Sequence, residues 1–152
     1  MRTFIVFAAA LLIACSAAVP SGWAQTAKKE FIGPVPADAS STAVKVPANQ
    51  HLLFLAGHTA SKPEGSSDYG TFDVQVKAAF AKIDKTLQAS GAKLTDIVQL
   101  SVFLTDMRYQ PQFAKLVQDM FKNGYPAIAY IEVSHMSDPQ LLIEIQPIAV
   151  IP

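Results

Sequence analysis

Residues 125–150, YPAIAYIEVSHMSDPQLLIEIQPIAV, decide the fold of this chain. Apolar residues alternate with other residues at a period of two in both halves of the stretch, which is the pattern of half-buried β-strands. The second half places Leu141, Ile143, Ile145 and Ala149 on one face, and Glu144 lies on the other face. Because a polar loop with Pro139 joins the halves, we predict two paired strands. Each strand has one apolar face for packing and one face that also carries polar side chains.

Length and composition indicate one globular domain. The chain has 152 residues, of which 51% are hydrophobic and 16% charged, so it can bury a core of normal size. Lysine and arginine number 12, and aspartate and glutamate also number 12. Nucleic-acid binding requires a basic face, and this balance of charge gives no reason to expect nucleic acid as a partner.

The N-terminal segment resembles an export signal. Arg2 precedes the apolar run 4–13, and Gly22-Trp23-Ala24 forms a small-residue cleavage site before Gln25. We therefore expect residues 1–24 to be a signal peptide and the protein to be periplasmic or secreted. A second cut also fits, because Leu12-Ile13-Ala14-Cys15 resembles a lipobox that would anchor Cys15 to a membrane. After cleavage at Ala24 no cysteine remains, so a disulfide and a thiolate nucleophile are both excluded.

The remaining chain divides into an extended arm, 25–41, and a domain, 42–152. In the domain we predict an antiparallel pair of strands at 42–46 and 51–56, a helix from 72 towards Gly91, a strand at 96–105 and a second helix from Pro111 to Gly124. Two helices cover one face of such a sheet. The other face carries side chains too apolar for water, so we expect an oligomer with clefts between its subunits; these side chains are Phe103, Ile128, Tyr130 and Leu142.

Several motifs resemble the RidA (YjgF-type) family of reactive-intermediate deaminases. They are Leu55-Ala56-Gly57, the run GAKLTDIV at 91–98, the run VFLTDM at 102–107, Tyr125-Pro126-Ala127 and the run IEIQPIAV at 143–150. The resemblance implies an α+β, chorismate-mutase-like fold and a homotrimer with three clefts at the subunit interfaces. It also implies hydrolysis of 2-imino acids to 2-keto acids and ammonia without a cofactor.

The sequence departs from the family pattern at the substrate-binding positions. Family deaminases have an arginine after Pro-Ala that binds the substrate carboxylate, and this chain has Ile128 there. An isoleucine offers no donor to a carboxylate. Tyr130 stands where the family often has cysteine, and Ala114 where it often has asparagine. Arg108, the only arginine after signal removal, is expected in a solvated loop.

Glu144 and Gly57 match the family pattern. The resemblance implies that Glu144 positions the hydrolytic water and that the Gly57 backbone lines the pocket; a structural carboxylate at the interface is the other interpretation of Glu144. Tyr130 is a candidate ligand donor or an interface aromatic, and His58 is a candidate at the mouth of the cleft. The three histidines lack metal-ligand spacing, so we expect no metal.

Two functions fit these residues. The first is an exported enzyme that hydrolyses an imine or enamine lacking a carboxylate, with Glu144 orienting water in an apolar cleft. The second is a non-catalytic trimer that binds a small apolar ligand or a protein in the same cleft. Export favours the second, because the imino acids that family deaminases remove arise in the cytoplasm.

Overall fold

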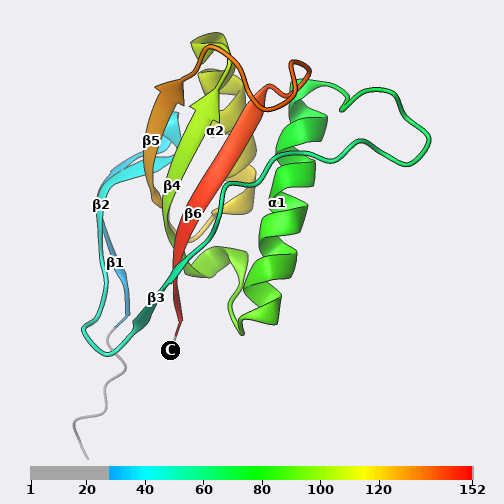
Figure 1. Cartoon of the computed structure of the whole chain (residues 1–152). Coiled ribbons are helices and arrows are strands. Elements are labelled where there is room, and N and C mark those ends of the chain that lie inside the picture. Colours follow the sequence, from blue (N-terminus) through cyan, green and yellow to red (C-terminus); the bar gives the residue numbers. More distant parts are fainter. Residues whose placement is uncertain (1–27, 152) are drawn as a thin grey trace, which may run out of the picture.

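The computed structural model describes residues 28–151. The expected signal peptide, the alternative lipidation site at Cys15 and the Ala24 cleavage site lie outside the described residues. The described chain forms an α+β fold in which two helices pack against a mixed sheet (Figure 1). The elements are, in order, β1 (Glu30–Val35), η1 (Pro36–Asp38), β2 (Ser40–Lys45), β3 (His51–Phe54), α1 (Phe72–Ala89), η2 (Leu94–Asp96), β4 (Ile97–Leu104), η3 (Met107–Tyr109), α2 (Gln110–Met120), β5 (Ala127–Glu132) and β6 (Ile143–Ile151).

The main sheet has the strand order β3-β6-β4-β5. The predicted pairing of the two strands in 125–150 is therefore wrong, because β4 lies between β5 and β6. Helix α2 forms the crossover from β4 to the parallel strand β5, whereas β6 pairs antiparallel with the opposite edge of β4. Strands β5 and β6 follow one another in the sequence but occupy opposite edges of β4, so they do not pair.

The N-terminal hairpin also differs from the prediction. Strand β2 pairs with β1, and β3 pairs with β6, so the expected hairpin between 42–46 and 51–56 does not form. The predicted arm thus contains a strand, in which Pro34 lies opposite Ser41. An edge strand tolerates proline because the missing N–H faces away from its partner. Ser41 fastens the hairpin to the sheet, since its amide donates to the carbonyl of Pro126 at 3.0 Å.

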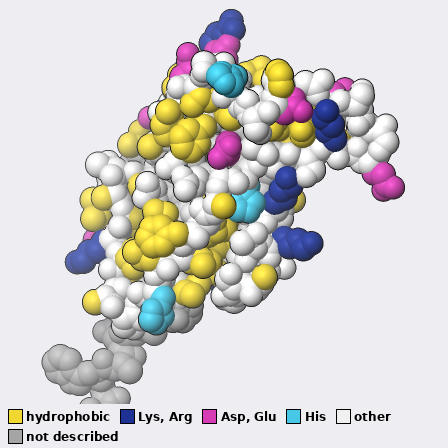
Figure 2. Space-filling model, viewed as in Figure 1, with side chains coloured by type: hydrophobic (Ala, Val, Ile, Leu, Met, Phe, Trp, Pro, Cys, Tyr) yellow, Lys and Arg dark blue, Asp and Glu magenta, His cyan; other side chains and the backbone are white. Residues whose placement is uncertain are grey.

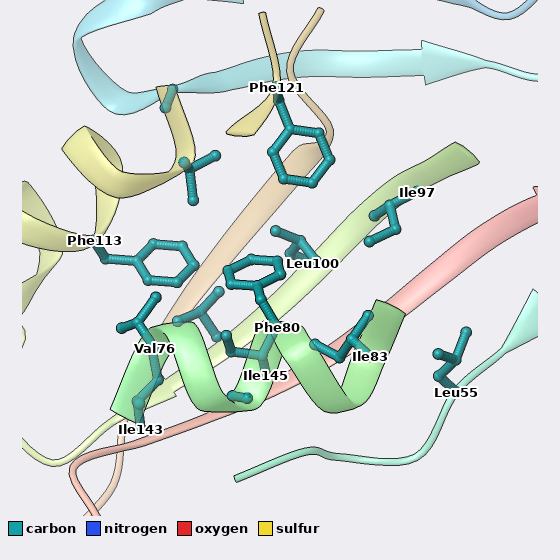
Figure 3. Packing of buried hydrophobic residues seen from close by; sticks show 14 of the residues in the cluster. Leu55, Val76, Phe80, Ile83, Ile97, Leu100, Phe113, Phe121, Ile143 and Ile145 are labelled. Atoms are coloured by element: carbon teal, nitrogen blue, oxygen red, sulfur yellow. The ribbon is translucent and has the colours of Figure 1, made fainter. Parts of the chain in front are cut away.

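Both helices form where the sequence predicts them, and they bury the predicted stripes against one face of the sheet (Figure 1). Their aromatic side chains meet between the layers, where the ring centroids of Phe80 and Phe113 are 6.2 Å apart (Figure 3). Leu100 and Ile145 close the core from the sheet side and are fully buried. The fold is therefore held by one continuous apolar layer between helices and sheet.

The second face of the sheet is uncovered in the described chain. Figure 2 shows hydrophobic side chains gathered over its strands, with acidic and histidine side chains among them. Phe54 is 69% exposed, and it pairs with Ile148 of β6. Phe103 also belongs to this open face, because it lies opposite Glu144 in the antiparallel register.

The faces of β5 are reversed relative to the prediction. Ile128 lies beside Leu100 and Tyr130 lies beside Val102 in the parallel register, and both β4 residues are buried under the helices. Laterally paired residues point to the same side of a sheet. Ile128 and Tyr130 therefore face the helix layer, while Ala129 and its neighbours of the same parity face outward.

The two ends of the described chain leave the molecule at the same end, where β1 begins and β6 finishes (Figure 1). The loop 133–142 lies at the opposite end and crosses the end of β4, since Thr105 donates its amide to the carbonyl of Leu142 at 3.2 Å. Across residues 28–151, no helix has the length and apolar character that crossing a membrane requires.

Gly124 gives a test of how β1 docks. Its φ is 136°, and a Cβ there would lie 2.9 Å from Cγ of Phe31 in β1. Gly91 also has a positive φ, 75°, but open space around its Cβ position. Gly91→Ala should cost only backbone strain, about 1–2 kcal/mol, and Gly124→Ala should cost at least about 1 kcal/mol more. Urea unfolding of both variants measures the difference. Equal losses of unfolding free energy in the two variants would mean that the packing of Phe31 does not require a glycine at position 124.

Candidate functional site

Glu144 and Gly57 lie together on the open face. Glu144 is the second residue of β6 and is half-buried, opposite Phe103 of β4. Gly57 follows β3 and lies under the glutamate side chain, so that a Cβ at position 57 would be 2.6 Å from Cδ of Glu144. Residues other than glycine would therefore displace the carboxylate. The structure thus brings together the two residues that match the family pattern.

A cavity of about 420 Å³ opens beside the carboxylate. Its walls come from β4, from β6 and from the loop that follows β5; the lining residues are Phe103, Val133, His135, Met136, Ser137 and Glu144. This loop is not among the site residues predicted from the sequence. A signal for it exists, because residues 134–137 directly follow a strand of the sheet that carries Glu144. The volume is sufficient for a small organic molecule of two rings or fewer.

The loop 133–142 is held by polar contacts from the helix side of the molecule. Gln75 of α1 is 1% exposed, its Oε1 accepts the amide of Leu142 at 2.9 Å, and its Nε2 donates to the carbonyl of Gln140 at 3.0 Å. Sequence reasoning does not find Gln75, because a single polar residue in an apolar stripe does not reveal its partner.

Asp138 connects the same loop to the long segment before α1. Its Oδ2 accepts the hydroxyl of Tyr69 at 3.2 Å and lies 3.8 Å from Nζ of Lys62. The amide of Gln140 has the largest effect on the Asp138 carboxyl and lowers its pKa; burial opposes this, and Tyr69 and Lys62 lower the pKa further. The cavity wall is therefore tied to two separate segments of the chain.

The His58 ring is directed at the backbone of Ala56 and at α1. Its Nδ1 lies 2.7 Å from the carbonyl oxygen of Ala56, and its Nε2 lies 3.4 Å from Oγ1 of Thr86. The backbone of His58 pairs with Ile145, the neighbour of Glu144. His58 is thus adjacent to the carboxylate through its backbone, and its part in ligand binding stays a prediction.

Ile128 and Tyr130 lie on the other face of the sheet from Glu144. The ring of Tyr130 meets Phe113 edge to face at 5.9 Å, and its hydroxyl is 3.5 Å from the carbonyl oxygen of Asp38. Burial raises the pKa of Tyr130 to about 12, with a smaller contribution from Asp38. The phenol is therefore a neutral donor at physiological pH. Within one chain these residues do not join Glu144 and Gly57.

The arrangement around Glu144 suits the handling of a water molecule. Its carboxylate lies over Gly57 and in the wall of the cavity, and a carboxylate oxygen there can accept a hydrogen bond from water or a ligand. Arg108 is exposed and pairs with Asp106, and this pairing lowers the pKa of Asp106 to about 2. The described residues hold no cluster of three or more metal-ligating side chains. A carboxylate in this position has the chemistry of a group that accepts a proton from water.

These features define a small α+β protein whose uncovered sheet face carries a carboxylate above a glycine, beside a cavity. The model of the family described as Endoribonuclease L-PSP, which includes the YjgF, RutC and RidA proteins, matches residues 33–151. A RutC family protein of Pyrococcus abyssi is 31% identical over 117 residues, which are 76% of this chain and 89% of that protein. The chain belongs to this family.

Two further comparisons concern activity and fold. A protein of Dermatophagoides farinae named 2-iminobutanoate/2-iminopropanoate deaminase is 25% identical over 120 residues, 79% of this chain and 91% of that protein. The crystal structure of a Rid family protein of Yersinia pestis superposes with a TM-score of 0.70 at 23% identity, and the match covers 81% of this chain and 98% of that one. The predicted α+β, RidA-like fold is therefore confirmed.

Proposed function

We propose that this protein hydrolyses a reactive imine or enamine that carries no carboxylate. The observation that supports this most strongly is the Glu144 carboxylate, which lies against Gly57 at the edge of a cavity and has oxygens available for water. The deaminase relative of Dermatophagoides farinae agrees with the reaction type. Export of the mature chain from Gln25 into the periplasm or medium is part of the proposal and rests on the sequence of residues 1–24.

In the proposed reaction Glu144 acts as a general base. It accepts a proton from water while the water oxygen bonds to the imine carbon, and the C=N double bond becomes a single bond. That proton then reaches the nitrogen and gives a carbinolamine, which carries a hydroxyl and an amino group on one carbon. The hydroxyl proton is transferred to the nitrogen, the C–N bond breaks, and ammonia leaves as the carbonyl forms. No electrons are transferred to or from another group, so the reaction needs only water.

Ile128 restricts the substrate in this proposal. A carboxylate that enters an apolar site without a partner is penalised by several kcal/mol, and isoleucine supplies no hydrogen-bond donor. Neutral imines avoid this penalty. The same observation favours the second candidate function, in which the cleft binds a small apolar ligand and catalyses no reaction.

The proposed assembly is a homotrimer, and its clefts unite the two separate sets of residues. Glu144 and Gly57 occupy the open face of one subunit, whereas Ile128 and Tyr130 lie at the edge strand β5 on the helix side. A neighbouring subunit that packs against the open face can bring its own β5 edge next to Glu144. The complete site would then form only between subunits.

Benzophenone imine tests the reaction directly, because it is neutral, stable and converted to a ketone with a distinct ultraviolet spectrum. We expect the purified protein to accelerate its hydrolysis, and Gly57→Ala to remove most of the acceleration by displacing Glu144. Gly65→Ala, in a loop where the added Cβ has no neighbour, is the control. Binding of the imine without acceleration would support the ligand-binding function instead.

Light scattering tests the assembly separately. The wild type should have the mass of a trimer at micromolar concentration. Phe54→Glu should shift it towards monomer, because Phe54 is 69% exposed on the open face and a buried carboxylate there would be unpaired. Val74→Glu is the matched control, since Val74 is 44% exposed on α1, and it should leave the mass unchanged. A monomeric wild type would contradict the interface clefts.

A further inference from the structure

A second cavity, of about 760 Å³, lies at the end of the molecule where β1 begins and β6 finishes. It shares no lining residue with the cavity beside Glu144. Three lysines and one aspartate line it, together with two asparagines, so it is a cationic and donor-rich site in a chain with equal numbers of basic and acidic residues. The charged lining residues are Lys28, Lys29, Lys93 and Asp96.

The lysines of this second cavity are only partly neutralised. The Lys29 ammonium donates to the carbonyl of Thr95 and lies 5.7 Å from the centre of the Phe31 ring. The Asp96 carboxylate accepts the backbone amide of Lys93 at 3.0 Å. Burial lowers the pKa of Lys29, nearby Asp96 opposes this effect, and the positive charge of Lys93 adds to it. Lys29 and Lys93 thus repel one another, and an anion between them would relieve this repulsion.

The second cavity is also lined by Gln50, whose side chain carries an unpaired acceptor, and by apolar surface. Oε1 of Gln50 is buried and, among the residues that the structure describes, has no hydrogen-bond partner. A buried acceptor without a partner costs free energy, which a bound donor would recover. Phe31 and Val150 supply apolar walls on two sides. The lining therefore combines cations, a glutamine with an unpaired acceptor and an apolar wall.

We infer that this second cavity binds an amphipathic organic anion: a molecule with a carboxylate, phosphate or sulfonate head, an apolar body and one N–H or O–H donor. The lysines bind the head, Phe31 and Val150 contact the body, and Gln50 accepts from the donor. The inference is independent of the proposed imine hydrolysis, because no residue of this cavity takes part in it.

The probe for this inference is 8-anilinonaphthalene-1-sulfonate, which has an anionic head, an apolar body and an N–H. N-phenyl-1-naphthylamine is the same molecule without the sulfonate. We expect the sulfonate to shift the backbone amide resonances of Lys29, Gln50 and Lys93 in nitrogen-15 spectra of the purified protein. Lys93→Gln should weaken its binding at least about fivefold, since charge-assisted hydrogen bonds exceed neutral ones.

The controls separate a specific site from general charge or hydrophobicity. Lys93 is exposed, so Lys93→Gln should fold normally, and Lys85→Gln on the exposed side of α1 makes the same charge change elsewhere. Gln50→Leu should weaken binding as well, because it removes the acceptor. Equal weakening by both lysine variants would overturn the proposal. So would equal affinity for the neutral probe, or resonance shifts confined to the open sheet face around Phe54 and Phe103.

Discussion

Ile128→Arg should raise kcat/KM for 2-iminobutanoate by about 100- to 1000-fold over a wild type that has little or none of this activity. An arginine would bind the substrate carboxylate through two charge-assisted hydrogen bonds, together worth about 3–4 kcal/mol, and each 1.4 kcal/mol corresponds to a factor of about ten. The structure adds a condition. Ile128 is half-buried on the helix side of the edge strand β5, so the guanidinium must extend past that edge into a cleft.

The assay generates the imine with threonine dehydratase and follows its decay in competition with semicarbazide. Ile128→Met is the control, because it supplies a long side chain without a donor and should leave the activity at the wild-type level. Thermal unfolding of both variants shows whether the fold is kept. Robust deamination of 2-iminobutanoate by the wild type would contradict the prediction. If the Arg variant folds but gains no deaminase activity, Tyr130 and Ala114 also contribute to the loss of that activity.

Glu144→Gln should lower the hydrolysis of benzophenone imine by about 100- to 10,000-fold, the range that general-base catalysis contributes. Glutamine keeps the size and the carbonyl oxygen of glutamate but cannot accept the proton of the attacking water. The variant should therefore still bind the imine, so KM should change much less than kcat. Stopped-flow absorbance gives both constants.

The matched control is Glu64→Gln, which makes the same chemical change in the exposed loop before α1 and should leave the rate of imine hydrolysis unchanged. Full activity in the Glu144 variant would show that the carboxylate takes no part in the reaction. If neither the wild type nor the variant hydrolyses the imine but both bind it, the cleft is a binding site and the carboxylate has a structural part.

The helices and the central strand could be predicted from sequence because their signals are local. Phe72, Val76 and Phe80 recur at helical spacing, and each is buried under the sheet. Strand β4 alternates from Val98 to Leu104 and is bounded by polar residues, so its assignment does not depend on distant parts of the chain.

Which strands pair, and which face of a strand meets the helices, could not be predicted in the same way, because both depend on non-local contacts. The period of β5 separates Ile128 from Ala129, but only its parallel register with β4 decides which of them meets the helices. The hairpin at β1 could not be predicted, because Pro34 and Pro36 argue against a strand unless its edge position is known.

In the candidate site, too, the residues with a local sequence signal could be predicted and the others could not. Glu144 and Gly57 could be found because they occur in short motifs that resemble a known family. The cavity wall at 134–137 and its support by Gln75 could not, since a buried amide that holds a loop through backbone groups leaves no pattern in the sequence.

The shared position of the two chain ends determines how the molecule can be attached to anything else. Residues 28 and 151 leave at one end, and the Glu144 cavity opens near the loop 133–142 at the other. A tether that continues directly from residue 28 or residue 151, whether a purification tag, a surface linker or a lipid, would therefore hold the described domain with the Glu144 cavity directed away from the support. The second cavity, between Lys28 and Lys93, would instead face the support and be the first part of the molecule that a tether hides.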